Sequence, residues 1–223
     1  MQTESTQLPP LSSSRWSRIG ALLYDPFVWV AELAGMRRSR RALLAQASGR
    51  VLEIGAGTGL NLAHYPDQLH ELVLVEPEPA MRERLTQRIR RAGRHAAVVD
   101  APAEALPFAD GSFDTVVCTL VLCTVSAPDR ALGEIGRVLR PDGRLLFIEH
   151  VRADEGERLA RWQDRMRPIG VRMAHGCRCN RRTVDGIRNA GFDVLDLERD
   201  EMKHVPPFVR PLVVGAATTP SAA

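Results

Sequence analysis

The chain has 223 residues, of which 44% are hydrophobic and 26% charged, and its formal net charge is +3. This length supports one domain with its own core, and no window reaches the ~18 to 20 uninterrupted apolar residues of a membrane span. The composition excludes long disorder. Two observations argue against nucleic acid as a partner: the arginines form no broad basic face, and only 5% of the residues are aromatic.

The N-terminal region predicts a tail followed by helices. Residues 1 to 14 are rich in Ser, Thr, Gln and Pro, cannot order themselves, and lack the apolar segment of a secretory signal, so we expect a cytoplasmic protein. From residue 15 to 47 the apolar spacing is helical, interrupted at Tyr24-Asp25-Pro26, and predicts a helical cap. We interpret the arginine group from Arg37 to Arg41 as a solvated helix start, with weak peripheral contact to a membrane as the alternative.

Residues 48 to 218 alternate between strand and helix patterns and predict one α/β domain. The predicted strands are Val51–Ile54, Glu71–Val75, Ala96–Val99, Thr115–Leu120, Arg144–His150, Phe192–Leu197 and Val209–Ala216. Helices such as Ala80–Arg91 and Ala127–Leu139 lie between them, the second ended by Pro141-Asp142-Gly143. This order predicts a seven-stranded, mostly parallel sheet with one antiparallel edge strand and helices on both faces. Residues 152 to 182 are predicted to form a lid and residues 219 to 223 a tail.

The stretch VLEIGAGTGLN joins the first predicted strand to an expected helix through Gly55, Gly57 and Gly59. Glycine lets backbone amides approach a ligand closely, and a helix N-terminus would favour an anionic group there. A phosphate loop is excluded because no Gly-Lys-Ser/Thr follows. The dinucleotide fingerprint is excluded because Leu60 stands where its third glycine should fall.

An acidic residue at the end of the second predicted strand narrows the ligand. Glu76 follows Gly55 by 21 residues and is placed to accept hydrogen bonds from two ribose hydroxyls. The alternative interpretation of Glu76 is a solvated carboxylate at a strand end. A ligand with a ribose and a carboxylate but no pyrophosphate satisfies both ends, and S-adenosylmethionine is such a ligand. We therefore expect Glu76→Ala to raise the Michaelis constant for this cofactor while leaving the melting temperature nearly unchanged.

Four motifs between residues 51 and 151 together resemble the class I S-adenosylmethionine-dependent methyltransferases, which have a Rossmann-like fold: VLEIGAGTG, VEPEPAM, AEALPFADGSFDTVV and RVLRPDGRLLFIEHV. The resemblance implies that the three glycines wrap the methionine part of the cofactor and that Glu76 holds the ribose. It also implies that Pro77 and Met81 flank the adenine.

The same resemblance assigns the remaining cofactor contacts. Ala103 and Glu104 are expected at the adenine edge, and Cys118, Thr119 and Leu120 opposite the sulfonium. The other expected cofactor-binding residues, on the first strand and its turn, are Glu53, Ala56, Thr58 and Asn61. Pro102 departs from the family, because many relatives have there an Asp that bonds the adenine amino group. Asp100 lies two residues earlier.

A narrower set of motifs, VVCTLVLCTV, FIEHV, HGCRCNRRT and VRPLVVGAA, is similar to the methyltransferase-like family that includes the alkyl-thiol S-methyltransferases. This implies methyl transfer to a small apolar acceptor, with a thiol favoured. Methylation of a lipid or quinone at N, C or O is the alternative, and a non-catalytic cofactor-binding partner protein is the second alternative. Membrane-bound members carry an apolar N-terminal anchor, from which the segment Ile19–Gly35 departs through its charged residues and proline.

Acceptor residues are expected at the carboxyl ends of the strands, in the cap and in the lid. His150, which ends the fifth predicted strand, is the candidate catalytic base or thiol-orienting group, with a structural histidine as the other interpretation. Tyr24, Phe27, Cys123 and His175 complete the expected substrate pocket, although apolar residues at helical spacing more often simply pack in a core, which is the other interpretation of the aromatic residues. We expect no metal site, because the pair Cys177 and Cys179 lacks a second close pair.

Overall fold

The fold was analysed in a computed structural model, which describes residues 25, 29, 32–154, 156–173 and 176–219. The strands are β1 (Arg50–Ile54), β2 (Glu71–Val75), β3 (Ala97–Val99), β4 (Phe113–Thr119), β5 (Leu139–His150), β6 (Asp193–Glu201) and β7 (Pro211–Thr218). The helices are η1 (Glu32–Met36), α2 (Arg37–Leu44), α3 (Pro79–Ala92), α4 (Pro128–Val138), α5 (Arg158–Met173), α6 (Thr183–Asn189) and the short 3₁₀ turn η2 (Pro207–Val209).

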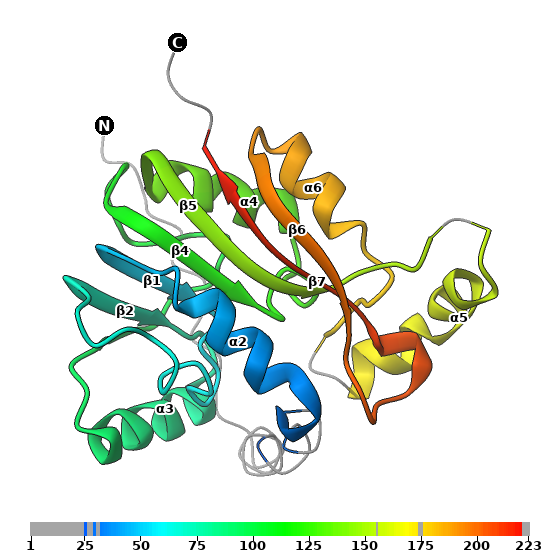
Figure 1. The fold of residues 1–223 in the computed structure, drawn as a ribbon, viewed down its shortest axis with the longest axis horizontal. Helices are drawn as coiled ribbons and strands as arrows, with labels where there is room; N and C mark the ends of the chain where they lie inside the picture. The colour runs from blue at the N-terminus through cyan, green and yellow to red at the C-terminus, as the bar shows by residue number, and fades with distance from the viewer. Residues whose placement is uncertain (1–24, 26–28, 30–31, 155, 174–175, 220–223) are drawn as a thin grey trace, which may run out of the picture.

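The strands form one seven-stranded sheet in the order β3-β2-β1-β4-β5-β7-β6. Strands β1 to β5 are mutually parallel, whereas β7 runs antiparallel to both β5 and β6. The predicted α/β fold and its antiparallel pairing at one edge are therefore confirmed. The antiparallel strand is not itself the edge strand, because β7 inserts between β5 and β6 and leaves β6 at the edge of the sheet (Figure 1).

Helices cover both faces of the sheet, which explains why the inner strands are apolar on both sides. Side chains of α4 and α6 pack on one face, and those of α2 and α3 pack on the other (Figure 1). Helix α5 lies beside the β6–β7 connection, where Trp162 and Phe208 meet edge to face with ring centroids 5.4 Å apart. Strands β1, β4 and β5 have their carboxyl ends at the end of the sheet that lies between α2 and α5 (Figure 1).

Most predicted elements appear within one or two residues of their expected bounds, and three local expectations are wrong. Strand β6 continues to Glu201, four residues beyond its expected end at Leu197, because Glu198 to Glu201 also pair with β7. Strand β5 begins at Leu139, not at Arg144, because Leu139 pairs with Phe113 and Arg144 with Thr115, so that the Pro141–Gly143 stretch bulges out of the strand instead of preceding it. The helix expected after the glycines is a series of tight turns through residue 64, with hydrogen bonds such as Gly59 N to Ala56 O and His64 N to Asn61 O.

Candidate functional site

The glycine turn lies at the carboxyl end of β1 and has the backbone conformation that its sequence predicts. Gly55, Gly57 and Gly59 have φ angles of +63°, +56° and +84°, which residues with a Cβ rarely adopt. A Cβ on Gly55 would also lie 2.6 Å from Cγ2 of Val121. Hydrogen-bonded turns, not a regular helix, follow the glycines, so a ligand would meet the individual amides of the turn.

Glu76 fastens the end of β2 to the glycine turn. Its Oε2 accepts a hydrogen bond from the Gly57 amide at 2.8 Å, and its Oε1 accepts one from the Glu78 amide at 2.9 Å. The side chain is only 7% exposed, and burial raises the pKa of the carboxyl group. Glu76 is therefore not a solvated carboxylate at a strand end.

A buried polar network connects β1, the turn and β4. Glu53, 2% exposed, accepts hydrogen bonds from Asn61 Nδ2 at 2.9 Å and from the Tyr65 hydroxyl at 2.7 Å. Asn61 Nδ2 also donates to Thr119 Oγ1 at 2.9 Å. Burial raises the pKa of Glu53 to about 7, although these hydrogen bonds and the charge of Arg40 act in the opposite direction.

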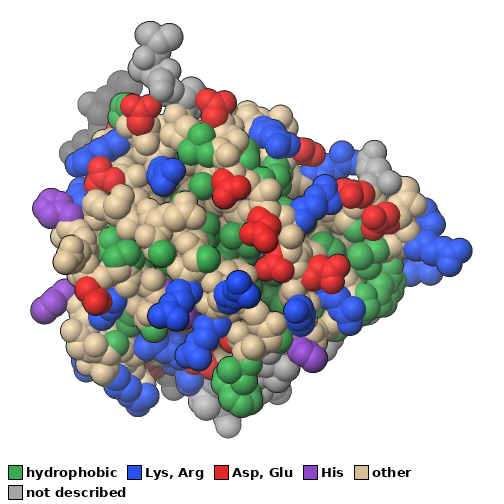
Figure 2. All heavy atoms as spheres, viewed as in Figure 1, with side chains coloured by type: hydrophobic (Ala, Val, Ile, Leu, Met, Phe, Trp, Pro, Cys, Tyr) green, Lys and Arg blue, Asp and Glu red, His purple; other side chains and the backbone are tan. Residues whose placement is uncertain are grey.

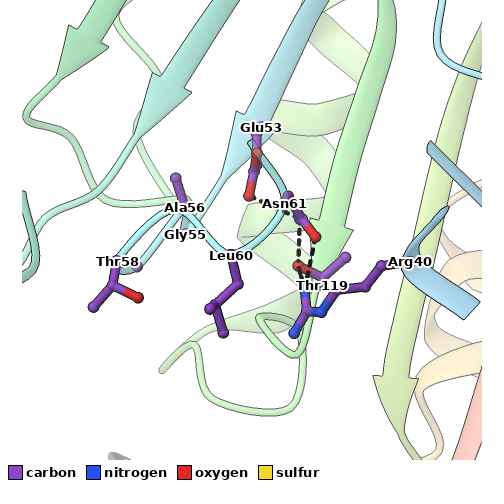
Figure 3. A pocket seen from close by; sticks show the side chains of 9 residues that line it. Arg40, Glu53, Gly55, Ala56, Thr58, Leu60, Asn61 and Thr119 are labelled. Atoms are coloured by element: carbon purple, nitrogen blue, oxygen red, sulfur yellow. Dashed lines mark hydrogen bonds between the residues drawn. The ribbon is translucent and has the colours of Figure 1, made fainter. Parts of the chain in front are cut away.

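The turn and this network line an open polar pocket with about 250 Å³ of space, part of which is continuous with solvent (Figure 3). Seven residues expected to bind the cofactor line it: Glu53, Gly55, Ala56, Gly57, Thr58, Asn61 and Thr119. Leu60 and Arg40 complete the lining, and Figure 3 shows Arg40 reaching Asn61 and Thr119 from the opposite side to the turn. The structure thus assembles these residues at one place, beside the end of β4.

A residue of the N-terminal segment also contacts the turn. Asp25 Oδ1 accepts a hydrogen bond from Thr58 Oγ1 at 2.5 Å, and its Oδ2 forms an ion pair with Arg88 of α3, also at 2.5 Å. Thr58 is 1% exposed. The contact links the segment before α2 to both the turn and α3.

The residues expected around the adenine lie on the β2 and β3 side of the turn. Pro77 is partly exposed and Met81 is buried at the start of α3. Ala103 is buried in the core, whereas the Glu104 carboxylate accepts hydrogen bonds from Ser126 and the Ala127 amide before α4. None of these four belongs to the 250 Å³ pocket.

Asp100, which follows β3, has its carboxylate 2.7 Å from Nη2 of Arg82. The same arginine donates through Nη1 to the backbone carbonyl of Glu76. Arg82 therefore links Asp100 to the end of β2.

The segment after β4 begins with a residue of strained backbone conformation, and a carboxylate of β5 binds the amides that follow it. Leu120 has a φ of +60°, uncommon for a residue with a branched side chain. Glu149 of β5, fully buried, accepts hydrogen bonds from the amides of Val121, Leu122 and Cys123 at 2.8 to 3.0 Å. Burial raises the pKa of Glu149 to about 7.

The three residues expected opposite the sulfonium, at the end of β4, have side chains in different surroundings. Thr119 faces the pocket, whereas Cys118 is fully buried among the core residues packed under α4 and α6. Leu120 packs partly buried against two of the core clusters.

His150 ends β5 on the face of the sheet that carries Thr119, because Thr119 pairs with Ile148 and side chains alternate along a strand. Burial lowers the pKa of His150 to about 4, although its ring lies against the backbone carbonyls of Pro211 and Val209. Its Nδ1 is buried and has no hydrogen-bond partner among the residues described. With this pKa the imidazole is neutral at pH 7.

Three cysteines lie in one buried cluster, one of them in the segment after β4 and two in the segment after α5. Cys123, Cys177 and Cys179 are buried together with Phe208, and the pKa of Cys123 is raised well above its ordinary value by a hydrogen bond with Cys177 and by burial. Within the described part of the chain, no group of three or more His, Cys, Asp or Glu side chains could hold a metal ion. The expected pocket residues Tyr24, Phe27 and His175 lie outside the described residues.

The sequence interpretation missed Arg40 and Glu149. Arg40 was grouped with solvated arginines, yet it is 4% exposed and shares a helix face with Met36, Leu43 and Leu44. That i, i+4, i+7, i+8 spacing places a charge within an apolar stripe, and this was the available signal. Glu149 carried a similar signal, since it interrupts the apolar run of β5.

Comparison with known proteins agrees with the fold and the turn. Residues 52–147 match the family model described as "Methyltransferase domain". Human thiol S-methyltransferase TMT1B is 38% identical over 191 residues, which cover 81% of this chain and 76% of that protein. Phosphatidylethanolamine N-methyltransferase of Cereibacter sphaeroides is 31% identical over 148 residues, 65% of this chain and 69% of that protein.

Among solved structures, a SAM-dependent methyltransferase from Thermotoga maritima superposes with a TM-score of 0.66 at 25% identity, covering 91% of this chain and 98% of that one. The fold and the glycine-turn pocket therefore define a methyltransferase of the Rossmann-like class. More narrowly, the chain belongs to the family of thiol S-methyltransferases represented by TMT1B. In the described segments, no helix has the length and apolarity needed to cross a bilayer.

Proposed function

We propose that this chain transfers the methyl group of S-adenosylmethionine to the sulfur of a small apolar thiol. The observation that carries the proposal is the similarity to thiol S-methyltransferase TMT1B, at 38% identity over most of the chain. The lipid methyltransferase matches a smaller share at 31% identity, so we place a thiol ahead of a lipid headgroup or a quinone as acceptor.

The donor set around the turn fits an adenosyl cofactor that carries an amino acid part. The Glu76 carboxylate stands beside the turn, where it suits two ribose hydroxyls. Glycines with positive φ leave the turn amides open to close approach, and the guanidinium of Arg40 adds positive charge to the pocket. When bound, the sulfonium of S-adenosylmethionine supplies the activated methyl group.

The chemistry asks the protein mainly for alignment. A bond forms between the acceptor sulfur and the methyl carbon while the bond from that carbon to the donor sulfur breaks, and the thiol proton is released. Charge is neutralised during this step, so the pocket must orient the two sulfurs and exclude water more than it must stabilise an anion. A thiol with a pKa of about 8.5 already supplies some thiolate at neutral pH.

His150 is our candidate for orienting the acceptor thiol or accepting its proton. Its neutral ring has a buried Nδ1 without a partner among the described residues, on the sheet face that also carries Thr119. With an acceptor thiol whose pKa is about 8.5, we expect His150→Phe to lower kcat at pH 7 but much less at pH 9, where most of that thiol is ionised without help from the protein. An equal loss at both pH values would assign His150 a structural role.

The expected domain limits and surroundings enter the proposal as well. We assign residues 15 to 47 to a cap, residues 48 to 218 to the methyltransferase domain, and residues 152 to 182 to a lid over the acceptor. The four cysteines are free, as the reducing cytoplasm would keep them. Trp29 and Leu33 are 61% and 58% exposed close to the arginines of α2, which supports weak peripheral contact with a membrane.

Charged side chains of both signs are interspersed over the face drawn in Figure 2. Nucleic acid binding normally uses a broad basic face, which this side of the molecule does not present. A small-molecule acceptor therefore remains our proposal for the partner.

The test offers matched acceptors that differ in the nucleophilic atom. The protein is incubated with methyl-labelled S-adenosylmethionine and hexane-1-thiol, hexan-1-ol, hexylamine, a hydroquinone, or phosphatidylethanolamine in liposomes, and products are read by mass spectrometry. We expect labelled hexyl methyl sulfide. Labelled lipid or quinol without the sulfide would favour the lipid or quinone alternative. Calorimetric binding of S-adenosylhomocysteine without any methylated product would indicate a non-catalytic partner protein.

A further inference from the structure

The segment after β4, residues 120 to 125, connects two sides of the proposed reaction site. Thr119, which ends β4, lines the pocket beside the glycine turn. The side chain of Val121 packs against Gly55, since a Cβ placed on this glycine would lie 2.6 Å from Val121 Cγ2. On its other side the segment meets the stretch after α5, because the Arg178 amide donates to the Cys123 carbonyl at 2.8 Å. The segment therefore lies between the cofactor pocket and the stretch predicted to form the lid.

One buried carboxylate holds the amide side of this segment. The Oε1 of Glu149, a fully buried residue of β5, accepts hydrogen bonds from the Val121 and Leu122 amides, both at 2.8 Å. Its Oε2 accepts one from the Cys123 amide at 3.0 Å. Burying a carboxylate is costly, and the three donors offset this cost only while the segment keeps its conformation. Glu149 thereby stabilises the backbone in which Leu120 has a φ of +60°, because strained residues persist only where surrounding contacts hold them.

An arginine holds the carbonyl side of the same segment. Arg181 lies half-buried between α5 and α6, and its Nη1 donates to the Leu122 carbonyl at 2.5 Å and its Nη2 to the Val125 carbonyl at 2.6 Å. The Arg181 carbonyl in turn accepts a hydrogen bond from the Arg152 amide at 2.9 Å, just after β5. The segment is thus held between a carboxylate of β5 and a guanidinium of the stretch before α6.

The position of Glu149 in β5 gives these contacts a consequence for the reaction. His150, our candidate for orienting the acceptor thiol, directly follows Glu149. Thr119 and Val121, at the other end of the hydrogen-bonded connection, lie on the cofactor side. The three hydrogen bonds therefore fix the cofactor side relative to the strand end that carries His150. Methyl transfer between two sulfurs depends on such alignment, and a displacement of about 1 Å can cost about 100-fold in rate.

We propose that Glu149 is a positioning residue for methyl transfer, which aligns the cofactor side and the acceptor side of the site through the segment after β4. Its carboxylate acts through the amides of residues 121 to 123, and Arg181 supports the same segment from its carbonyl side. This inference rests on the proposed function, because it concerns the alignment of a thiol acceptor with the cofactor.

The test separates alignment from cofactor binding. Glu149→Gln keeps one oxygen for the Val121 and Leu122 amides but turns an N–H donor toward the Cys123 amide. We expect kcat with hexane-1-thiol, measured well below the melting temperature, to fall by about 10- to 100-fold. Calorimetry should give a Kd for S-adenosylhomocysteine within about 3-fold of wild type, because Glu76 and the glycine turn are unchanged. A merely structural role would lower the melting temperature without this separation of kcat from affinity.

Asp114→Asn is the matched control. The Asp114 carboxylate also accepts a backbone amide, that of Arg50 at 2.7 Å, and it pairs with Arg140. It lies near the start of β4, however, at the opposite end of the strand from Thr119. Asp114→Asn should lower the melting temperature and leave kcat nearly unchanged.

Should Glu149→Gln not fold, Arg181→Met releases the same segment from its carbonyl side and should give the same lowered kcat with nearly constant affinity. A folded variant with the kcat of wild type, or an equal loss of kcat in Asp114→Asn, would overturn the positioning role alone. A wild type that binds S-adenosylhomocysteine but forms no hexyl methyl sulfide would overturn the proposed function and this inference with it.

Discussion

Replacing Glu76 by alanine should weaken cofactor binding and destabilise the fold at the same time. The carboxylate accepts hydrogen bonds from the Gly57 and Glu78 amides at 2.8 and 2.9 Å, and only 7% of the residue is exposed. Alanine leaves both amides without their acceptor. The sequence alone led us to expect an unchanged melting temperature, and these two contacts revise that expectation.

The size of the effect follows from the number and burial of the lost contacts. An unmade hydrogen bond at a buried donor costs about 1 to 3 kcal/mol. The raised pKa of Glu76 shows that burying this carboxylate has its own cost, so we take the lower end for each donor, about 2 kcal/mol in total. For a chain of this size that corresponds to a fall in melting temperature of roughly 4 to 8 °C.

Binding should weaken by about 10- to 100-fold, since hydrogen bonds to a charged group are worth about 1.5 to 3 kcal/mol. Thermal unfolding and calorimetric titration with S-adenosylhomocysteine measure the two effects separately. Glu71→Ala is the control, because Glu71 begins the same strand with its side chain 43% exposed and, among the described residues, is paired with Arg50 alone. A melting temperature within a degree of wild type would refute the structural half of this reasoning, and unchanged affinity would refute the ribose contact.

Three further outcomes follow from the buried groups. Burial raises the pKa of Glu53 from 4.5 to about 7, so its contribution to stability is complete below about pH 4.5 and is lost as the pH rises through 7. The stability of the wild type relative to Glu53→Gln, measured in urea, should therefore fall by about 3 kcal/mol from pH 4.5 to 8, whereas a constant difference would contradict the shift. Gly55→Ala should cost about 2 to 4 kcal/mol, because its φ is +63° and the new Cβ would meet Val121. Gly93→Ala, with a similar φ of +62° and open space around it, should cost only about 1 kcal/mol, and equal losses would exclude crowding as the cause. Finally, Cys123 in the native protein should resist iodoacetamide at pH 8 and react after unfolding, because its thiol is buried with a raised pKa; fast native labelling would show that this cluster opens.

The strands and the glycine turn could be predicted because their signals are local. Apolar runs such as Leu72–Val75 indicate a strand buried on both faces wherever the chain places it. The position of β7 could not be read in this way, because a hairpin signal shows that two strands pair but not which of them meets β5. Likewise, Pro141 and Gly143 resemble a helix stop, and only pairing of Leu139 with Phe113 reveals a bulged strand.

The proposed cofactor pocket was predictable on the side made by consecutive residues and not on the side made by distant ones. The turn residues from Gly55 to Asn61 follow one another, so their spacing carries the information. Arg40 reaches the pocket from a separate helix, and its role depends on contacts with Asn61 and Thr119 across long sequence separations. Residue type alone could not distinguish it from its exposed neighbour Arg41.

The place of β7 in the sheet affects how the protein folds during synthesis. Strand β7 is the last of the strands in the described part of the chain, yet it inserts between β5 and β6. Until its residues leave the ribosome, β5 has an unpaired edge that includes the apolar side chains of Phe147 and Ile148, and β6 has no neighbour in the sheet. Unpaired strand edges are templates for pairing with other chains, so we expect this protein to be most prone to aggregation while β7 is not yet in place.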